Sequence, residues 1–93
     1  MNKYELLYII SADATEEQRE ALIQKFKAYV EERGGNVEAL DKWGMRKFAY
    51  PISFKNEGFY VLMNFTSKPE LVSEMNALMN ITDYIVRQMF VAK

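Results

Sequence analysis

The sequence of 93 residues contains no cysteine and no histidine. Without cysteine the chain can form no disulfide and no thiolate metal site, which fits a reducing compartment such as the cytoplasm. Without histidine the usual general base and the commonest metal ligand are missing, so carboxylates, lysines, tyrosines and hydroxyls would have to carry any catalysis. We therefore expect a protein that is not an enzyme and that holds no cofactor and no metal.

Long apolar runs and glycine-rich loops are absent as well. No run approaches the about 18 apolar residues of a membrane span, and the apolar run in MNKYELLYII is too short for a signal peptide. We expect neither secretion nor contact with a membrane. No GxGxxG or P-loop pattern occurs, so a phosphate-binding glycine loop is not supported and we expect no small-molecule substrate.

The chain as a whole has no excess of basic residues over acidic ones, but one segment does. The net charge is −1, so the protein lacks the field of an autonomous nucleic-acid binder. Residues 42–55 hold four bases and no acid, with aromatic residues between the charges, whereas residues 13–38 hold seven acids against four bases. An anionic partner should therefore meet the segment 42–55.

Hydrophobic periodicity predicts six elements in a single domain that spans residues 1–93. Thr15 and Gln18 have the spacing of a capping box, and Pro69 stands where a proline is favoured in the first turn of a helix. The first helix should bury a stripe of Leu22, Phe26, Tyr29 and Val30 that ends in the charge of Arg33. The predicted strands cover residues 3–10, 37–52, 58–65 and 84–92, and the predicted helices cover 15–35 and 69–80.

The second predicted strand changes phase along its length. Val37 and Ala39 share one parity, whereas Tyr50 and Ile52, which we expect in the core, share the other. A one-residue bulge at Gly44 would restore the phase, because glycine adopts the bulge conformation at little steric cost. The strand is also longer than a usual strand, so part of it should project beyond the core before a turn over residues 54–58.

The order βαββαβ is that of a ferredoxin-like α+β fold. Right-handed crossovers predict a four-stranded antiparallel sheet of order 4-1-3-2 with both helices on one face. Phe59, Val61, Met63 and Phe65 should face the helices. Tyr60 and Leu62 from the third strand, and Leu7 and Ile9 from the first, should line the open face, which is apolar enough to favour a protein or a tight RNA surface over it.

Residues 43–53, WGMRKFAYPIS, closely resemble the hallmark segment of the ribosomal protein S6 family, which commonly reads W/L-G-x-R-x-L-A-Y-P-I. Tyr4-Glu5, Gly34-Gly35, and residues 58–60 and 86–91 also fit, so the resemblance covers essentially the whole chain. Phe48 replaces the usual leucine, and Lys47 stands where arginine or another polar residue is common; neither changes the chemistry.

The resemblance implies a structural component of the small ribosomal subunit that binds the central domain of small-subunit ribosomal RNA together with the small basic ribosomal protein S18. The basic partner would compensate for the net charge of −1, so the chain alone should bind RNA weakly. Carried over residue by residue, the resemblance implies RNA contacts at Lys3, Tyr4, Arg46, Lys47, Arg87 and Lys93, and contacts with the partner protein at Lys42, Trp43 and Met45. The location implied is the cytoplasmic ribosome.

Other interpretations of the same residues stay open at this point. The basic strand could be a solvated edge whose lysines guard against aggregation. The domain could also be a ferredoxin-like regulatory module that dimerises through its sheet and binds an effector, although SADATEE, between the first strand and the first helix, lacks the glycine usual in such ligand loops. An enzyme is the third alternative, and the missing histidine and cysteine weigh against it.

Overall fold

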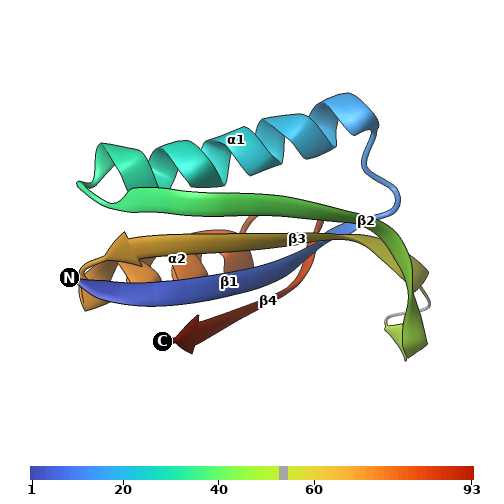
Figure 1. Cartoon of the computed structure of the whole chain (residues 1–93). Coiled ribbons are helices and arrows are strands. Elements are labelled where there is room, and N and C mark those ends of the chain that lie inside the picture. Colours follow the sequence, from blue (N-terminus) through green and yellow to red (C-terminus); the bar gives the residue numbers. More distant parts are fainter. Residues whose placement is uncertain (53–54) are drawn as a thin grey trace.

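The structure, a computed structural model, describes the chain except for residues 53–54, and it describes no side chains for residues 48–56. The predicted core positions Tyr50 and Ile52 therefore lie outside the described side chains. Figure 1 shows the predicted βαββαβ order. The elements are β1 (Asn2–Ser11), α1 (Glu16–Glu32), β2 (Asn36–Ile52), β3 (Lys55–Ser67), α2 (Pro69–Asn80) and β4 (Ile85–Ala92).

The ends of both helices follow from short polar signals in the sequence. Thr15 and Gln18 form the predicted capping box at the start of α1, with hydrogen bonds of 3.1 Å to the Gln18 amide and 2.9 Å to the Thr15 amide. Gly34, with φ of 83°, supplies the left-handed residue that follows the helix. Pro69 begins α2, where its missing N–H costs nothing. The predicted bounds of the second helix are confirmed, whereas the first helix ends at Glu32, three residues before the predicted end.

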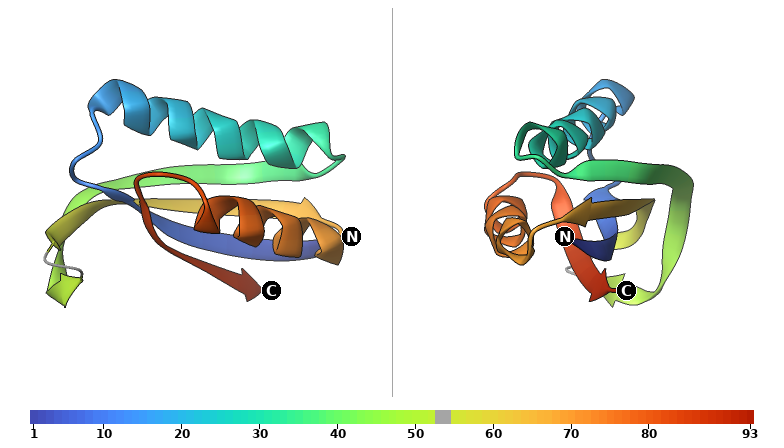
Figure 2. Two further views of the ribbon diagram at one scale, coloured as in Figure 1. Left: turned by 180° about the vertical axis from the view of Figure 1, so that it is seen from behind. Right: turned by 60° about the vertical axis from the view of Figure 1, so that its left-hand side comes forward.

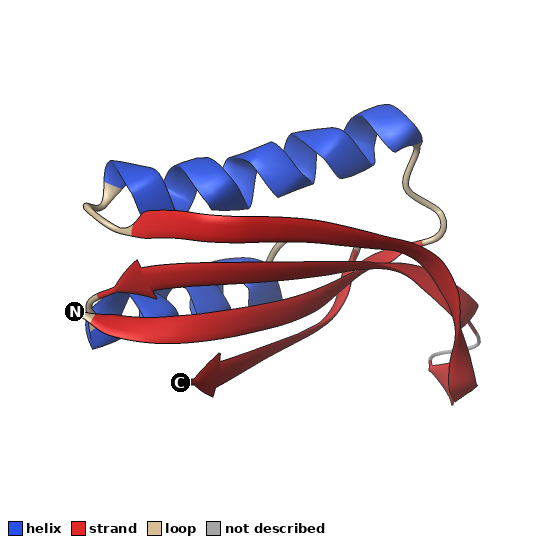
Figure 3. Cartoon of the chain, in the orientation of Figure 1, coloured by secondary structure: helices blue, strands red, loops and turns tan. Residues whose placement is uncertain are grey.

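The four strands form one antiparallel sheet of order β2-β3-β1-β4, which is the predicted order read from the other edge. Both helices lie on the same side of this sheet, and the other side carries no helix (Figures 2 and 3). We call that uncovered side the open face. The fold class predicted from the sequence is therefore confirmed.

The core lies between the sheet and the helices and is filled by large apolar side chains. The Tyr8 ring meets the Phe26 ring edge-on, with centroids 5.5 Å apart, and Tyr4 packs on Phe65 at 5.7 Å. Val61 and Met63 of β3 are fully buried, as their parity predicts. The helix stripe is confirmed in Phe26 and Val30, although Ile23, which the pattern did not single out, is equally buried.

Strand β2 contains the predicted bulge. Its register against β3 shifts between Lys42 and Gly44, and Gly44 has a φ of 91°, a conformation in which a Cβ atom would be strained. A second shift, between Val37 and Ala39, was not predicted. Beyond the bulge at Gly44 the distal part of β2 bends away from α1 and projects from the body of the domain (Figure 1).

One sequence-based expectation needs correction. The predicted turn over residues 54–58 is wrong from Lys55 onward, because β3 already begins at Lys55.

Strand β4 contains a bulge of its own. Its register shifts between the residues that pair with Ile9 and Ile10, because one extra residue, Val86, separates the pairing positions of Ile85 and Arg87. Ile85 therefore packs against the core, whereas Arg87 stays on the open face.

Candidate functional site

One row of residues crosses the whole open face at the end nearest the projecting part of β2. Ile9 of β1 lies between Arg87 of β4 and Tyr60 of β3, and Tyr60 in turn lies opposite Gly44 of β2. Trp43, the extra residue of the bulge, adjoins this row. We call Arg87, Ile9, Tyr60, Gly44 and Trp43 the aromatic row; it joins four strands that the sequence keeps far apart.

Within the aromatic row, Trp43 and Tyr60 form a parallel pair. Their ring centroids lie 6.4 Å apart and their planes differ by 6°, an offset arrangement that aromatic quadrupoles favour. The Arg46 guanidinium carbon lies 5.5 Å from the centre of the Trp43 ring, within cation–π range. Trp43 nevertheless remains 44% exposed, so this indole is available at the surface.

A band of apolar side chains lies beside the aromatic row on the same face. Leu7 of β1 pairs with Leu62 of β3 on one side and with Met89 of β4 on the other, and Val91 follows two residues after Met89. Met89 is 49% exposed and Val91 is 46% exposed. We call Leu7, Leu62, Met89 and Val91 the apolar band. Large apolar side chains gathered on one face of a small domain are typical of an interaction surface.

The far end of the open face is polar. The Lys93 ammonium donates a hydrogen bond to Asn64 Oδ1 at 2.8 Å and lies 3.3 Å from Glu5 Oε2. The Lys93 amide donates to the carbonyl of Lys3 at 2.9 Å, which holds two of the predicted RNA-binding lysines at adjacent backbone positions. The open face thus has cationic residues at both ends and apolar residues between them.

The three residues expected to meet a protein partner do not share one surface. Trp43 lies on the open face, whereas Lys42 turns toward α1 and places its ammonium 2.7 Å and 2.8 Å from the two Glu20 carboxylate oxygens. Met45 pairs with Phe59, a residue that packs on the core side, although its own side chain is exposed. Within this trio, only Trp43 contacts the open face, through its ring contact with Tyr60.

The residues expected to bind RNA are likewise divided. Arg46, Lys47, Arg87, Lys3 and Lys93 are all exposed. Tyr4 is only 8% exposed, its ring lies on Phe65, and its hydroxyl accepts a hydrogen bond from Asn2 at 3.3 Å. This burial corrects the expectation that Tyr4 faces outward beside Lys3, because neighbouring residues of a strand point to opposite faces. We leave Tyr4 out of the contact surface.

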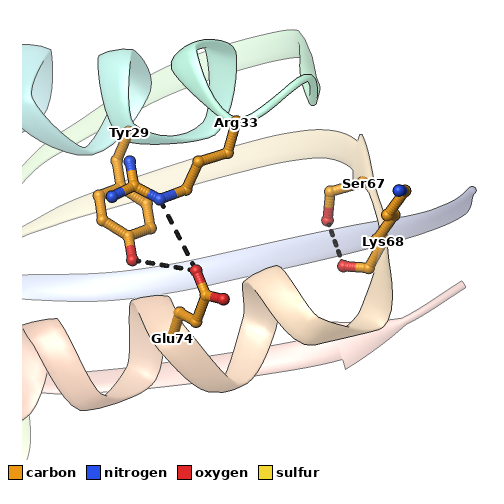
Figure 4. Close-up of polar contacts among 5 residues, drawn as sticks. All are labelled: Tyr29, Arg33, Ser67, Lys68 and Glu74. Carbon is orange, nitrogen blue, oxygen red and sulfur yellow. Dashed lines mark hydrogen bonds and ion pairs between the residues drawn. The ribbon is translucent and has the colours of Figure 1, made fainter.

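Two arginines on the helix side of the molecule make contacts within the chain. The Arg33 guanidinium lies 3.7 Å from the centre of the Tyr29 ring, and its Nε is 3.6 Å from Glu74 Oε2 (Figure 4). Figure 4 also shows Ser67, whose hydroxyl donates to the Lys68 carbonyl at 3.1 Å. Arg19 similarly covers the Phe59 ring at 4.3 Å. These arginines join elements of the fold, in contrast to Arg87 at the edge of the open face.

The fold changes the acidity of one tyrosine in the core. Burial raises the pKa of the Tyr8 phenol, and the nearby Glu20 carboxylate raises it further, so this hydroxyl stays protonated at neutral pH. Among the residues that the structure describes, no group of three or more acidic side chains is placed to hold a metal ion.

The sequence did not predict the pairing of Trp43 with Tyr60. Among the aromatic residues, it placed only Tyr60 on the open face. The signal was present in the Trp-Gly dipeptide, because a bulge at Gly44 moves the residue before it out of the regular alternation. Strict alternation along the strand places Lys42 and Gly44 on one face and Trp43 on the other. Alternation does not predict that the Trp43 ring contacts the Tyr60 ring.

Comparison with known proteins agrees with this architecture. The sequence model of the family described as "Ribosomal protein S6" matches residues 3–92. The chain belongs to the ribosomal protein S6 family. It is 46% identical over 91 residues to "Small ribosomal subunit protein bS6" of Caldanaerobacter subterraneus subsp. tengcongensis and 47% identical to that of Clostridium novyi, covering 98% of this chain and 96% of each relative.

The fold of this S6 family member is shared with a solved structure. The crystal structure of the 30S ribosomal protein S6 from Thermotoga maritima superposes with a TM-score of 0.93 at 33% identity, covering 99% of this chain and 87% of the other. The chain is thus an S6 protein of the small ribosomal subunit, which confirms the resemblance and the expected ribosomal location. The family is structural rather than catalytic. Membership in it therefore does not support the two alternative interpretations of the sequence, a regulatory effector-binding module or an enzyme. No helix in the described part of the chain is long and apolar enough to cross a membrane.

Proposed function

We propose that this S6 protein is a non-catalytic component that binds the central domain of small-subunit ribosomal RNA together with ribosomal protein S18. The observation that carries the proposal is the division of the open face into an apolar band and two cationic ends. An apolar band requires cover by a protein or by closely packed RNA, whereas exposed cations at the edges suit phosphates.

The RNA side of the proposal depends on exposed cations. Arg46 and Lys47 lie where β2 leaves the body of the domain, so their side chains can reach an RNA that the rest of the sheet does not touch. Arg87 occupies the β4 edge of the aromatic row, and Lys3 and Lys93 occupy the other end of the sheet. Contacts of this kind neutralise phosphates and position the protein without reading base sequence.

The protein side depends on the apolar band and its acidic surroundings. Met89 and Val91 are each almost half exposed, and burying them would release about 25 cal/mol per Å² of apolar surface. Asp41 lies opposite Leu62 at the border of the apolar band, and Glu5 lies between Val91 and Asn64. Carboxylates beside an apolar surface favour a partner that is basic as well as apolar, which is the character expected of S18.

Shared binding explains why an RNA-binding protein can carry a net charge of −1. Affinity for RNA grows with the number of phosphates that are neutralised, and the 12 basic residues of this chain are offset by 13 acidic residues. A basic partner would add the missing positive charge, while this chain supplies the shaped surface and its local cations. The pair should therefore bind RNA much more tightly than this chain alone.

The proposal can be tested by placing a charge in the apolar band. We expect Met89→Asp to abolish association with S18, measured by co-purification, and to prevent sedimentation with small subunits. Ile81→Asp is the matched control, because Ile81 is 81% exposed and lies at the end of α2, away from the open face. Normal sedimentation of the Met89→Asp protein with small subunits and S18 would contradict the proposed function.

A further inference from the structure

We infer that Trp43 is a stacking site for one unpaired base of RNA, with Arg46 and Arg87 holding the phosphates on either side. The inference rests on the proposed function, since it names the kind of RNA that one part of the open face receives. It also assigns Trp43 to the RNA, whereas the resemblance alone assigns this residue to the partner protein.

The first support is the geometry of the platform. Tyr60 lies parallel to Trp43 in a stacked pair, so the Tyr60 ring supports the indole and fixes the orientation of its plane. An indole that is 44% exposed within such a pair can accept a base, because every base has a π-face and stacking on aromatic side chains is tolerant of sequence. An isolated exposed tryptophan on a flexible loop would lack this fixed plane.

The second support is the position of the two arginines. The Arg46 guanidinium carbon lies over the Trp43 ring, 5.5 Å from its centre, at the β2 end of the row. Arg87 lies at the other end of the same row, three strand spacings or about 14 Å from β2. With the reach of an arginine side chain at each end, this span suits a short single-stranded segment that has one base on Trp43 at the β2 end, one phosphate beside Arg46 and a further phosphate at Arg87.

The neighbouring charges fix how such a segment would lie. Asp41, one row away and opposite Leu62, would repel a phosphate placed over the apolar band. The sugar-phosphate backbone should therefore avoid the Asp41 side of Trp43, which leaves the apolar band for the protein partner.

The position of Trp43 follows from the backbone of β2. Gly44 adopts its φ of 91° directly after Trp43, where the register against β3 shifts. This glycine conformation sets the bulge that turns Trp43 onto the open face. A preformed platform loses less conformational entropy when a base stacks on it, which raises affinity.

Intrinsic fluorescence gives a direct test, because Trp43 is the single tryptophan of the chain. The full chain is titrated with a short oligoadenylate and with an abasic oligomer of the same length, which carries the same phosphates but no bases. We expect oligoadenylate to quench the Trp43 emission to a plateau and the abasic oligomer to leave it nearly unchanged. Equal effects of the two oligomers would overturn the stacking site, as would quenching by S18 alone with no further change on adding RNA.

Variants separate this inference from the proposed function. Trp43→Leu should weaken binding of oligoadenylate, and of central-domain RNA in the presence of S18, by about 10-fold, the usual cost of losing one stacked base. Trp43→Phe should recover most of that loss, and Tyr84→Leu, which removes a similarly exposed aromatic away from the open face, should have no effect. Wild-type RNA affinity for Trp43→Leu would refute the stacking site and leave joint RNA binding intact, whereas failure of the wild-type pair to bind RNA would refute the proposed function itself.

Discussion

Lys42 and Trp43 are adjacent in the chain but act on opposite faces of β2. The Lys42 ammonium contacts both Glu20 oxygens on the helix side, at 2.7 Å and 2.8 Å, and the Trp43 ring lies parallel to Tyr60 on the open face. One of these two residues therefore joins β2 to α1, and the other belongs to the binding surface.

We predict that Lys42→Met lowers the free energy of unfolding by about 0.5 kcal/mol, as expected for a partly exposed ion pair. Association with S18 and RNA should change little, because Lys42 does not face the open side. Urea denaturation and co-purification measure the two quantities, with Glu20→Gln as the companion variant. Loss of S18 binding in Lys42→Met but not in Glu20→Gln would show that Lys42 touches the partner directly.

We predict that Gly44→Ala destabilises the domain by about 1–2 kcal/mol, because a side chain at positive φ is strained even though no atom lies near the added Cβ. It should also alter the Trp43 emission and weaken RNA binding, since the bulge sets the position of the indole. Gly34→Ala is the control, with a φ of 83° and similarly open space at the end of α1. If both variants bind RNA equally well after correction for stability, the bulge does not shape the site.

Much of this fold can be predicted from the sequence because its signals are local. The capping box at Thr15, the proline that begins α2 and the apolar alternation of β3 each depend on residues within one element. The bulge at Gly44 was also predictable, because the parity of β2 changes along the strand and glycine suits the positive φ.

The side on which single residues lie was less predictable, because it depends on pairing between strands. The register shift beside Val86 moves Ile85 into the core and leaves Arg87 outside, and no residue type at Val86 signals it. The resemblance implies a contact with the partner protein at Lys42, and the structure places Glu20 of α1 next to its ammonium. The resemblance also implies an RNA contact at Tyr4, although alternation along β1 places its ring against Phe65.

Arg87 should contribute to RNA binding through phosphate contact, because it lies exposed at the β4 end of the aromatic row. We predict that Arg87→Ala weakens binding about equally for RNAs of different sequence and the same shape. The slope of log affinity against log salt should become shallower by about one unit. Arg33→Ala removes an equal charge from the helix side and serves as the control. Parallel salt titrations for wild type and Arg87→Ala would remove Arg87 from the interface.

Tyr8→Phe should leave the domain equally stable or stabilise it by about 1 kcal/mol at neutral pH, because the Tyr8 hydroxyl is buried and finds no hydrogen-bond partner among the described residues. The pKa of this phenol is raised in the folded state, so the unfolded chain releases the proton first, at about pH 10. Wild-type stability should therefore fall as the pH rises above about 10, and the variant should lack this part of the loss. Urea midpoints at neutral and alkaline pH measure the difference, and a difference that does not change with pH would contradict the assignment.

The most direct test of joint binding is the affinity of this chain for central-domain RNA, measured by filter binding at one salt concentration with and without S18. The chain alone should bind weakly, because its net charge is −1 and the apolar band remains uncovered. We predict that saturating S18 tightens binding by about 100-fold, or about 3 kcal/mol. Equal affinities with and without S18 would contradict the central claim that this protein binds RNA as one half of a pair.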